Sequence, residues 1–338
     1  MPSISDRLTV IITTSPAPSN PATDLIASVL QSFQQHCAGL TDARVVVVFD
    51  TFERITSQSR LKKGHASPEV AGNYELYKSN IKELILQTYR HAQDGQAVSQ
   101  SHGEAEFGFE GRVELLISQT DNRKITFIEP AARLGFGLAV RSALRMVETP
   151  YVWVQQHDWA LVADIPLDPL LEIMQGSEGD DAVSVKYVSF PSVRMKRYAV
   201  SPHVTNHPGL RELTTSLKRD FVTQSIPEQK IPLTPLFFWF DKPHVASTAH
   251  YLARVFPTRL AMRRGEFIED KIGQRARTQM KEGQWAKWAT WLYYPDEGDL
   301  LCLRHLMGRT WRGFAGPINV KGGHVTVAED EESHPVPA

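Results

Sequence analysis

One nine-residue stretch, Tyr151 to Trp159 (YVWVQQHDW), constrains the fold of this chain more than any other. It begins as an apolar run and ends abruptly in Gln155, Gln156, His157 and Asp158. An apolar run bounded in this way predicts a buried strand. In an α/β sheet, polar groups at the carboxyl end of such a strand face the crevice where ligands bind. We therefore expect a buried strand that ends in a binding corner.

Other segments extend this strand into a sheet. Leu8 to Thr14 (LTVIITT) and Arg44 to Phe49 (RVVVVF) are β-branched runs typical of buried parallel strands. Thr23 can cap a helix between them that runs to about Gln35, which makes a right-handed β-α-β unit. Residues 125–128 predict another strand, and the glycine-opened segment 133–147 predicts a helix directly before Tyr151. We expect an α/β fold with a mixed, mostly parallel sheet flanked by helices.

The remaining segments are assigned by pattern. We expect one domain over residues 1–327, with a nucleotide-sugar-binding half (8–160), an insertion at about 54–120, an acceptor-binding half (161–327) and a disordered acidic tail (328–338). Within it we predict helices at 72–91, 168–174 and 243–255, a surface loop at 92–111, and strands at 182–190 and 233–240. Residues 113–118 fit either a short helix or a strand, and residues 191–230 show no clear period.

Charge and cysteine content exclude several classes of protein. The 338 residues include 37 Lys and Arg against 38 Asp and Glu, a formal net charge of −1, which argues against a general nucleic-acid binder. Two cysteines leave no disulfide framework and no cysteine zinc site. No apolar run approaches the roughly 18 residues that a transmembrane helix needs. We expect a soluble cytoplasmic protein, and peripheral attachment to a membrane is compatible with the sequence.

The polar corner has a chemical interpretation. A divalent cation that bridges a diphosphate needs hard oxygen ligands, and one carboxylate plus phosphate oxygens can suffice. Asp158 is the candidate ligand, and the alternative is an aspartate that caps the following turn. Trp159 is either a wall for a sugar or part of the core.

The ends of the first two strands offer further polar groups. Asp50 can accept a hydrogen bond from a base N–H or a ribose hydroxyl, or can form an Asx turn. Thr14 and Ser15 end the first strand at the same edge. Arg133 and Arg141 accompany a glycine-rich helix start that either approaches an anion or is a plain helix start.

Two clusters lie late in the chain. Glu269 and Asp270 follow the aromatic run that contains Trp239, and a carboxylate near an acceptor hydroxyl can act as a general base. An exposed acidic turn is the alternative. His305 lies among arginines that include Arg309; imidazole can complete a metal shell, and arginines bind phosphate.

These segments, in this order, resemble family-2-type glycosyltransferases of the GT-A fold. The resemblance spans residues 8 to 312 and is closest at LGFGLAVRSALRMVETPYVWVQQHD. Gln156-His157-Asp158 stands where that family has Asp-x-Asp, so the second acid is retained as Asp158 while Gln156 replaces the first. Glu269-Asp270 resembles the acceptor-side motif of the family, and His305 resembles a late histidine that binds the metal in some members.

The resemblance implies transfer of a hexosyl or deoxyhexosyl group, with inversion, from a UDP-, GDP- or dTDP-linked donor to a hydroxyl of a glycan or other acceptor. Asp270 would be the base, with Glu269 as the second choice, and Asp158 and His305 would hold Mn²⁺ or Mg²⁺. Thr14, Ser15, Asp50, Arg133, Arg141, Gln156, His157 and Arg309 would contact the nucleotide sugar, and Trp159 and Trp239 the acceptor.

Two other functions remain open from the sequence. A sugar-nucleotide pyrophosphorylase would carry a glycine-rich basic loop after the first strand, where this chain has SPAPSNP. A non-catalytic nucleotide-sugar- or glycan-binding protein with a degenerate metal site would explain Gln156.

Overall fold

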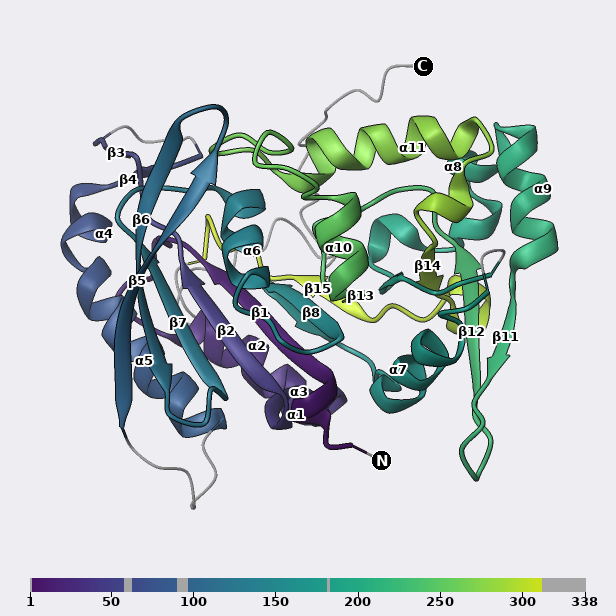
Figure 1. Cartoon of the computed structure of the whole chain (residues 1–338), viewed down its shortest axis with the longest axis horizontal. Coiled ribbons are helices and arrows are strands. Elements are labelled where there is room, and N and C mark those ends of the chain that lie inside the picture. The colour runs from purple at the N-terminus through teal and green to yellow at the C-terminus, as the bar shows by residue number, and fades with distance from the viewer. Residues whose placement is uncertain (1, 58–62, 90–96, 181–182, 312–338) are drawn as a thin grey trace, which may run out of the picture.

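The computed structural model describes residues 2–57, 63–89, 97–180 and 183–311. Within them one large sheet of eleven strands has the order β11-β12-β14-β10-β13-β8-β1-β2-β7-β6-β5 (Figure 1). Two small sheets pair β15 with β9 and β3 with β4. The strands are β1 Leu8–Thr14, β2 Arg44–Phe49, β3 Arg54–Ile55, β4 His65–Ala66, β5 Val98–Phe107, β6 Gly111–Thr120, β7 Ile125–Pro130, β8 Tyr151–Gln156, β9 Trp159–Leu161, β10 Tyr187–Ser189, β11 Arg219–Val222, β12 Lys230–Pro235, β13 His244–Ser247, β14 Thr290–Tyr293 and β15 Leu303–His305.

Most strands of the large sheet point the same way. The central strands β8, β1, β2 and β7 are parallel neighbours, and β10 is parallel to β14. Following the antiparallel pairings outward, only β6, β12 and β13 of the eleven are reversed. The predicted α/β fold with a mixed, mostly parallel sheet is confirmed.

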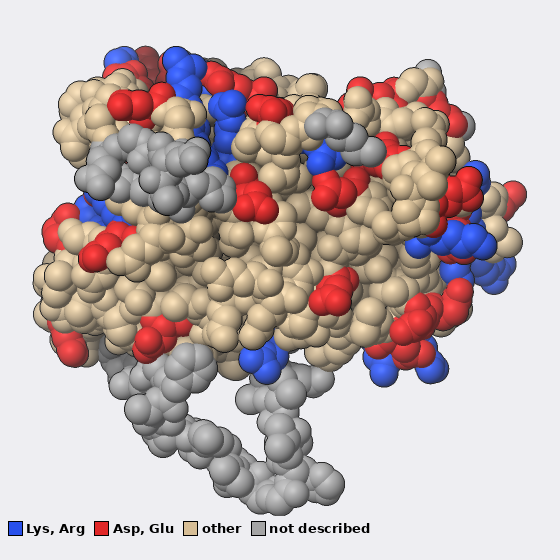
Figure 2. All heavy atoms as spheres, turned by 90° about the horizontal axis from the view of Figure 1, so that it is seen from below, with Lys and Arg blue, Asp and Glu red and all other residues tan. Residues whose placement is uncertain are grey.

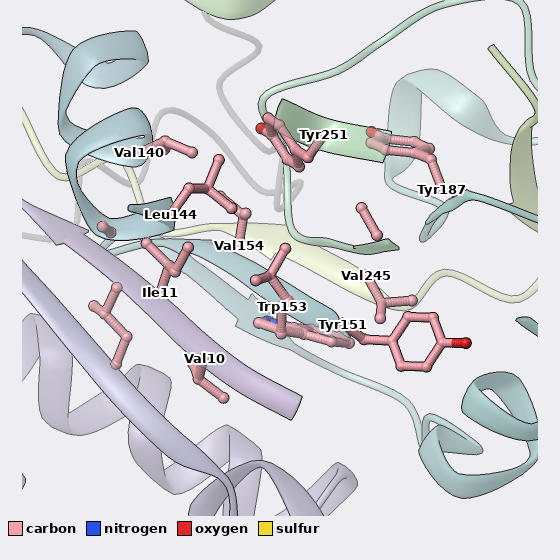
Figure 3. Close-up of a cluster of buried hydrophobic side chains, with 14 of the residues drawn as sticks. Val10, Ile11, Val140, Leu144, Tyr151, Trp153, Val154, Tyr187, Val245 and Tyr251 are labelled. Carbon is pink, nitrogen blue, oxygen red and sulfur yellow. The ribbon is translucent and has the colours of Figure 1, made fainter. Parts of the chain in front are cut away.

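Helices lie on both faces of this sheet (Figure 1). They are α1 Ile4–Arg7, α2 Asp24–His36, α3 Gly39–Asp42, α4 Pro68–Gly72, α5 Tyr74–Tyr89, α6 Phe136–Leu144, α7 Leu167–Gly176, α8 Pro202–Thr205, α9 Pro208–Leu217, α10 Thr248–Arg254 and α11 Gln274–Lys281. Because successive side chains of a strand point to opposite faces, the core has two layers. Figure 3 shows Ile11 and Val154 on the side of α6 and Val10 and Trp153 on the opposite side.

Residues 98–107, within the predicted surface loop 92–111, instead form the edge strand β5. It pairs with β6 over its whole length, from Val98 with Thr120 to Phe107 with Gly111. Most of its side chains are exposed, so it lacks the apolar alternation that identifies a strand in a sequence. Backbone hydrogen bonds to β6 define it instead. Residues 92–96 of the predicted loop lie outside the described residues.

The predicted helix 243–255 is wrong in its first part. His244 to Ser247 form β13, which lies antiparallel to β8 and begins with the pair His244 and Val154. Only Thr248 to Arg254 are helical. The predicted strand 233–240 is shifted, since β12 spans Lys230–Pro235. Of the described part of the predicted strand 182–190, which begins at residue 183, only Tyr187–Ser189 form a strand. These boundaries depend on which strands become neighbours, and a local sequence pattern carries no such information.

The structure bears on the predictions about membrane spans and nucleic-acid binding. Among the described residues, no helix combines the length and apolarity required to cross a membrane. On the face drawn in Figure 2, basic and acidic side chains lie in separate small groups rather than in one continuous basic surface. The predicted tail, 328–338, lies outside the described residues.

A largely buried ion-pair network connects Lys78 and Lys82 of helix α5 to Glu129 of strand β7. Glu129 accepts hydrogen bonds from Lys82 and lies 3.0 Å from the Nζ of Lys78, and its side chain is 12% exposed. Burial alone would raise the pKa of Glu129, but the hydrogen bonds from the two lysines outweigh it and hold that pKa below its usual value. The ionised carboxylate therefore stabilises the fold at neutral pH.

We expect Glu129→Gln to lower the free energy of unfolding by about 1–3 kcal/mol at pH 7, because Lys82 loses its charged partner and Lys78 keeps only the exposed Glu75. The lowered folded-state pKa means that this contribution is complete above the ordinary Glu pKa and disappears as pH falls through the folded value. Urea unfolding from pH 7 to pH 3 should show the two proteins converging in stability. Glu228→Gln at an exposed site is the control, and equal effects of both substitutions would contradict the prediction.

Candidate active site

The carboxyl ends of β1 and β8 meet, as expected for adjacent parallel strands. The His157 N–H donates to the carbonyl of Thr13 at 3.1 Å. The His157 Nδ1 accepts the backbone N–H of Ser15 at 3.1 Å and lies 3.2 Å from the Thr14 hydroxyl. Because Nδ1 is an acceptor, the neutral ring carries its proton on Nε2. Burial lowers the pKa of His157, which keeps the ring neutral.

Asp158 and His305, the two predicted metal ligands, are brought together. Strand β15 pairs with β9 so that His305 lies opposite Trp159, with the two rings 4.7 Å apart between centroids. The Nε2 of His305 lies 3.0 Å from the Oδ2 of Asp158, which also accepts the N–H of Gly308 at 3.2 Å. Burial would raise the pKa of Asp158, but these partners together lower it to about 2. The carboxylate is ionised at neutral pH.

This pair fits a divalent cation as two protein ligands. A carboxylate oxygen and an imidazole nitrogen already face each other, and a metal ion can take the place of the proton between such groups. Among the described residues, no group of three or more His, Cys, Asp or Glu could hold a metal. The described residues therefore supply two ligands here, as in sites where substrate phosphates and water complete the coordination.

Gln156 occupies a structural position beside this pair. Its Nε2 donates to the carbonyl of Asp241 at 2.9 Å and so links β8 to the loop after β12. The adjacent Gln155 is fully buried and donates to the carbonyl of Trp159, which holds the turn between β8 and β9.

Glu269 is connected to the same loop by two reciprocal hydrogen bonds. The N–H of Asp241 donates to the Glu269 carboxylate, and the N–H of Glu269 donates to the Asp241 carboxylate, both at 3.2 Å. Burial, and then the charge of Glu269, raise the pKa of Asp241 well above its usual range. Glu269 is half-buried, whereas Asp270 is exposed. Both begin a single π-helical turn, Glu269–Gly273, a feature frequent at functional sites.

Lys242 is a site residue that the sequence did not single out. Its Nζ donates to the Ser192 hydroxyl at 2.9 Å and lies 5.7 Å from the ring centroid of Trp159 and 5.0 Å from that of Phe240. Burial lowers the pKa of Lys242 to about 8. In the sequence, its only signal is its place directly after the aromatic run LFFWF and Asp241.

We call Gln156, His157, Asp158, Trp159, Lys242, Glu269 and His305 the carboxyl-edge cluster.

Asp50 holds the start of α6. Its carboxylate accepts the N–H groups of Leu134 at 2.6 Å and Gly135 at 2.9 Å, and that of Thr51 at 3.0 Å. Burial raises the pKa of Asp50 against the lowering effect of these donors. Both carboxylate oxygens are therefore engaged within the protein.

The glycines at this helix start approach another part of the backbone. Gly135 has a φ of 82°, and a Cβ there would overlap the backbone of Gly265. The N–H of Gly265 donates to the Leu134 carbonyl at 2.7 Å, and that of Gly137 to the Glu266 carbonyl at 3.1 Å. This crossing positions the segment that leads to Glu269. Its hydrogen bonds also use backbone N–H groups that an anion at this helix start would need.

The remaining predicted site residues, three arginines and Trp239, lie outside the carboxyl-edge cluster. Arg133 packs over Gly64 and Gly265 with a nitrogen 3.5 Å from Glu53, and Arg141 donates to the Glu106 carbonyl on β5. Arg309 is exposed, one residue after Gly308. Trp239 is fully buried, with its ring 4.4 Å from Tyr187 and 4.9 Å from Tyr251. This burial places Trp239 in the core rather than on a surface that an acceptor can contact.

A surface hollow of about 250 Å³ lies apart from this cluster. It is lined by residues of β11, β12 and the turn after β14, including Lys218, Tyr294 and Glu297. It shares no residue with the carboxyl-edge cluster.

Comparisons with known proteins give a likeness of structure only. No family model matches the chain, and no curated protein matches it. Solved structures similar to it include a mannosyltransferase from Pyrobaculum calidifontis in complex with GDP-Man and Mn²⁺ (14% identity, 86% of this chain and 58% of that chain, TM-score 0.41). Others are residues 1–349 of S. aureus TarS in complex with UDP-GlcNAc (11%, 88% and 57%, TM-score 0.41) and glucosyl-3-phosphoglycerate synthase from Mycobacterium tuberculosis (12%, 85% and 68%, TM-score 0.36).

This chain thus spans less than three fifths of the length of the first two proteins. At these scores the likeness to nucleotide-sugar transferases assigns no activity to the chain.

Asp50→Asn should act on stability rather than on nucleotide binding. An amide places an NH₂ group where one carboxylate oxygen accepts a buried N–H, so we expect a loss of about 1–3 kcal/mol in the free energy of unfolding. Urea unfolding measures this loss, and calorimetry with UDP, GDP and dTDP measures affinity. Asp121→Asn at an exposed site is the control. A large loss of affinity at unchanged stability would instead make Asp50 a nucleotide ligand.

Proposed function

We propose that this protein is an inverting glycosyltransferase that moves a hexosyl or deoxyhexosyl group from a nucleoside-diphosphate sugar to a hydroxyl acceptor. One observation carries the proposal. The ionised Asp158 meets His305 at the carboxyl edge of the sheet, and a half-buried carboxylate, Glu269, is tied to the same edge through Asp241. Sugar transfer needs these two functions: neutralisation of a leaving diphosphate and removal of a proton from the acceptor.

On the donor side, Asp158 and His305 would hold Mn²⁺ or Mg²⁺. The bound ion would neutralise charge on the leaving diphosphate as a Lewis acid. Thr14, Ser15 and His157 lie at the adjoining strand ends and would contact the nucleotide of a UDP-, GDP- or dTDP-linked donor. Trp159, which contacts His305, would face the sugar.

On the acceptor side, the arrangement favours Glu269 over Asp270 as the base. The Glu269 carboxylate is oriented by the Asp241 N–H, and Asp241 in turn accepts a hydrogen bond from Gln156, two residues from Asp158. Asp270 is exposed and has no such connection among the contacts of the described residues. A general base must be held in a fixed orientation toward the acceptor hydroxyl, so we favour the carboxylate that already accepts the Asp241 N–H.

The donor site and the acceptor site would come mainly from different halves of the chain. Residues 8–160 would provide most of the donor site and residues 161–327 most of the acceptor site, within one domain. His305 is an exception, since it comes from the second half and joins Asp158 of the first.

A non-catalytic nucleotide-sugar-binding protein is the second candidate. Gln156 carries no charge and its amide is committed to the Asp241 carbonyl, so the corner holds one acid where the family pattern has two. The two candidates differ in whether sugar is released from a bound donor.

The metal role of Asp158 can be tested by Asp158→Asn, which keeps the shape and removes the charge. Calorimetry with UDP, GDP and dTDP should show that Mn²⁺ strengthens binding of one of them to the wild type but not to the variant. Turnover of the donor should fall by about 10²–10³-fold, as when one strong stabiliser of developing charge is lost. Metal-independent binding by the wild type, or normal turnover by the variant, would remove this role.

The choice of base can be tested with a matched pair of substitutions. Glu269→Gln should lower transfer by about 10²–10⁴-fold, the usual contribution of general base catalysis, with nucleotide affinity preserved. Asp270→Asn should transfer nearly as the wild type does. The reverse pattern would assign the base to Asp270. If the wild type binds a donor but releases no sugar from it, the binding-protein candidate gains support.

A further inference from the structure

Asp241 links the donor side of the proposed site to its acceptor side. Its carbonyl accepts the amide of Gln156 at 2.9 Å, and its N–H donates to the Glu269 carboxylate at 3.2 Å. Its carboxyl group accepts the Glu269 N–H, also at 3.2 Å. The first two contacts use backbone atoms that any residue has, so only the third depends on the aspartate side chain.

Buried side chains fix the loop on both sides of Asp241. The Tyr187 hydroxyl donates to the Phe240 carbonyl at 3.1 Å and accepts the Phe240 N–H at 3.3 Å. The His244 Nδ1 donates to the Lys242 carbonyl at 2.7 Å. Tyr187 and His244 are fully buried, so this loop is a firm support for what packs against it.

The π-helical turn Glu269–Gly273 contacts this loop at both of its ends. At the start, Glu269 exchanges its two hydrogen bonds with Asp241. At the end, a Cβ on Gly273 would lie 2.7 Å from the Trp239 carbonyl oxygen, so only glycine allows this approach. The direction of the Glu269 side chain therefore depends on the loop, and the Asp241 carboxyl group holds the first residue of the turn.

The Asp241 carboxyl group is poorly placed to carry a charge. It is 2% exposed, and its Oδ2 has no hydrogen-bond partner among the described residues. Both oxygens of the buried Asp50, by contrast, accept backbone N–H groups. A buried carboxylate with one oxygen unpaired and a second carboxylate, Glu269, beside it is destabilised. The raised pKa of Asp241 agrees with a group that stays protonated at neutral pH.

The neighbouring ionisable groups do not supply a compensating charge. Those in the loop, β10, β13, α10 and the π-helical turn are Tyr187, Lys242, His244, Tyr251, Glu269 and Asp270. Burial raises the pKa of both tyrosines and lowers that of His244 to about 4, so all three are neutral at pH 7. The Lys242 ammonium group donates to Ser192 instead.

We propose that the Asp241 side chain is a positioning residue for Glu269, and that it acts as a neutral, protonated carboxyl group. This inference rests on the proposed function. In that reaction the acceptor oxygen bonds the anomeric carbon, its proton passes to Glu269, and the diphosphate leaves with the electron pair of the broken bond. A neutral Asp241 fixes the turn without adding a second negative charge beside the base.

Two substitutions separate the hydrogen bond of Asp241 from its charge. Asp241→Asn keeps an acceptor for the Glu269 N–H and copies the shape of the neutral acid, whereas Asp241→Ala removes the acceptor. The probes are UDP-glucose, GDP-mannose and dTDP-glucose, with water as the acceptor. We expect the asparagine variant to keep most of kcat, and the alanine variant to lose about 10–100-fold in kcat at unchanged KM for the donor. Asp220→Ala, at an exposed strand position, is the control.

The dependence of kcat on pH tests the neutral state. The acid limb of the profile should lie at the same pH in the wild type and in Asp241→Asn. An ionised Asp241 would give a different result, because its replacement would remove a negative charge beside the base and move the limb to lower pH. That shift would overturn the proposal, as would wild-type kcat in Asp241→Ala or an equal loss in both variants.

Stability gives a readout that needs no turnover. A carboxyl group that is protonated in the folded chain and ionised in the unfolded chain lowers stability as pH rises above the ordinary Asp pKa. In urea, the unfolding free energy of Asp241→Asn relative to the wild type should therefore increase from pH 4 to pH 7. A constant difference would refute the neutral state, whereas absence of turnover in the wild type would count against the proposed function instead. Thermal melts show whether Asp241→Ala is folded, and both pH series need only the asparagine variant.

Discussion

The arrangement of the site depends on one hydrogen bond that joins Asp158 to His305, 147 residues later in the chain. It forms because β8 ends in a tight turn and because β15 returns to pair with β9. Gly308 makes the approach possible, since a Cβ there would lie 2.8 Å from the His157 Nε2 and 3.0 Å from the Asp158 carboxylate. The burial of Asp158 is tolerable only with these partners, which also keep it ionised.

A second constraint brings the proposed base to the same edge. The backbone of Gly135 crosses that of Gly265 so closely that neither a side chain nor a ligand fits between them. Asp50 holds one side of this crossing through Leu134 and Gly135. The segment after Gly265 then leads to Glu269, which closes on Asp241. The donor-side corner and the acceptor-side carboxylate are thus positioned by separate parts of the chain, and Asp241 joins them through its hydrogen bonds with Gln156 and Glu269.

The expectations that failed share a physical cause. The exposed strand β5 is held by backbone pairing along β6, and β13 is a strand because β8 and β10 lie on either side of it. Trp239 looked like a possible surface for a sugar because it is aromatic, but it packs among Tyr187, Tyr251 and Trp288 in the core. Lys242 was missed because its significance comes from Trp159 and Ser192, which are distant in sequence.

The sequence by itself determined the strands β1, β2 and β8, and with them the α/β class and the edge at which polar residues would gather. Apolar runs of β-branched residues are enough for this, because burial on both faces of a parallel strand leaves a local signature. The tertiary structure alone decided that His305 reaches Asp158, that Asp50 and the glycines hold a backbone crossing, and that Glu269 rather than Asp270 is tied to the site. Each of these depends on distances between residues far apart in the chain, which are set by the packing of the whole sheet and its helices.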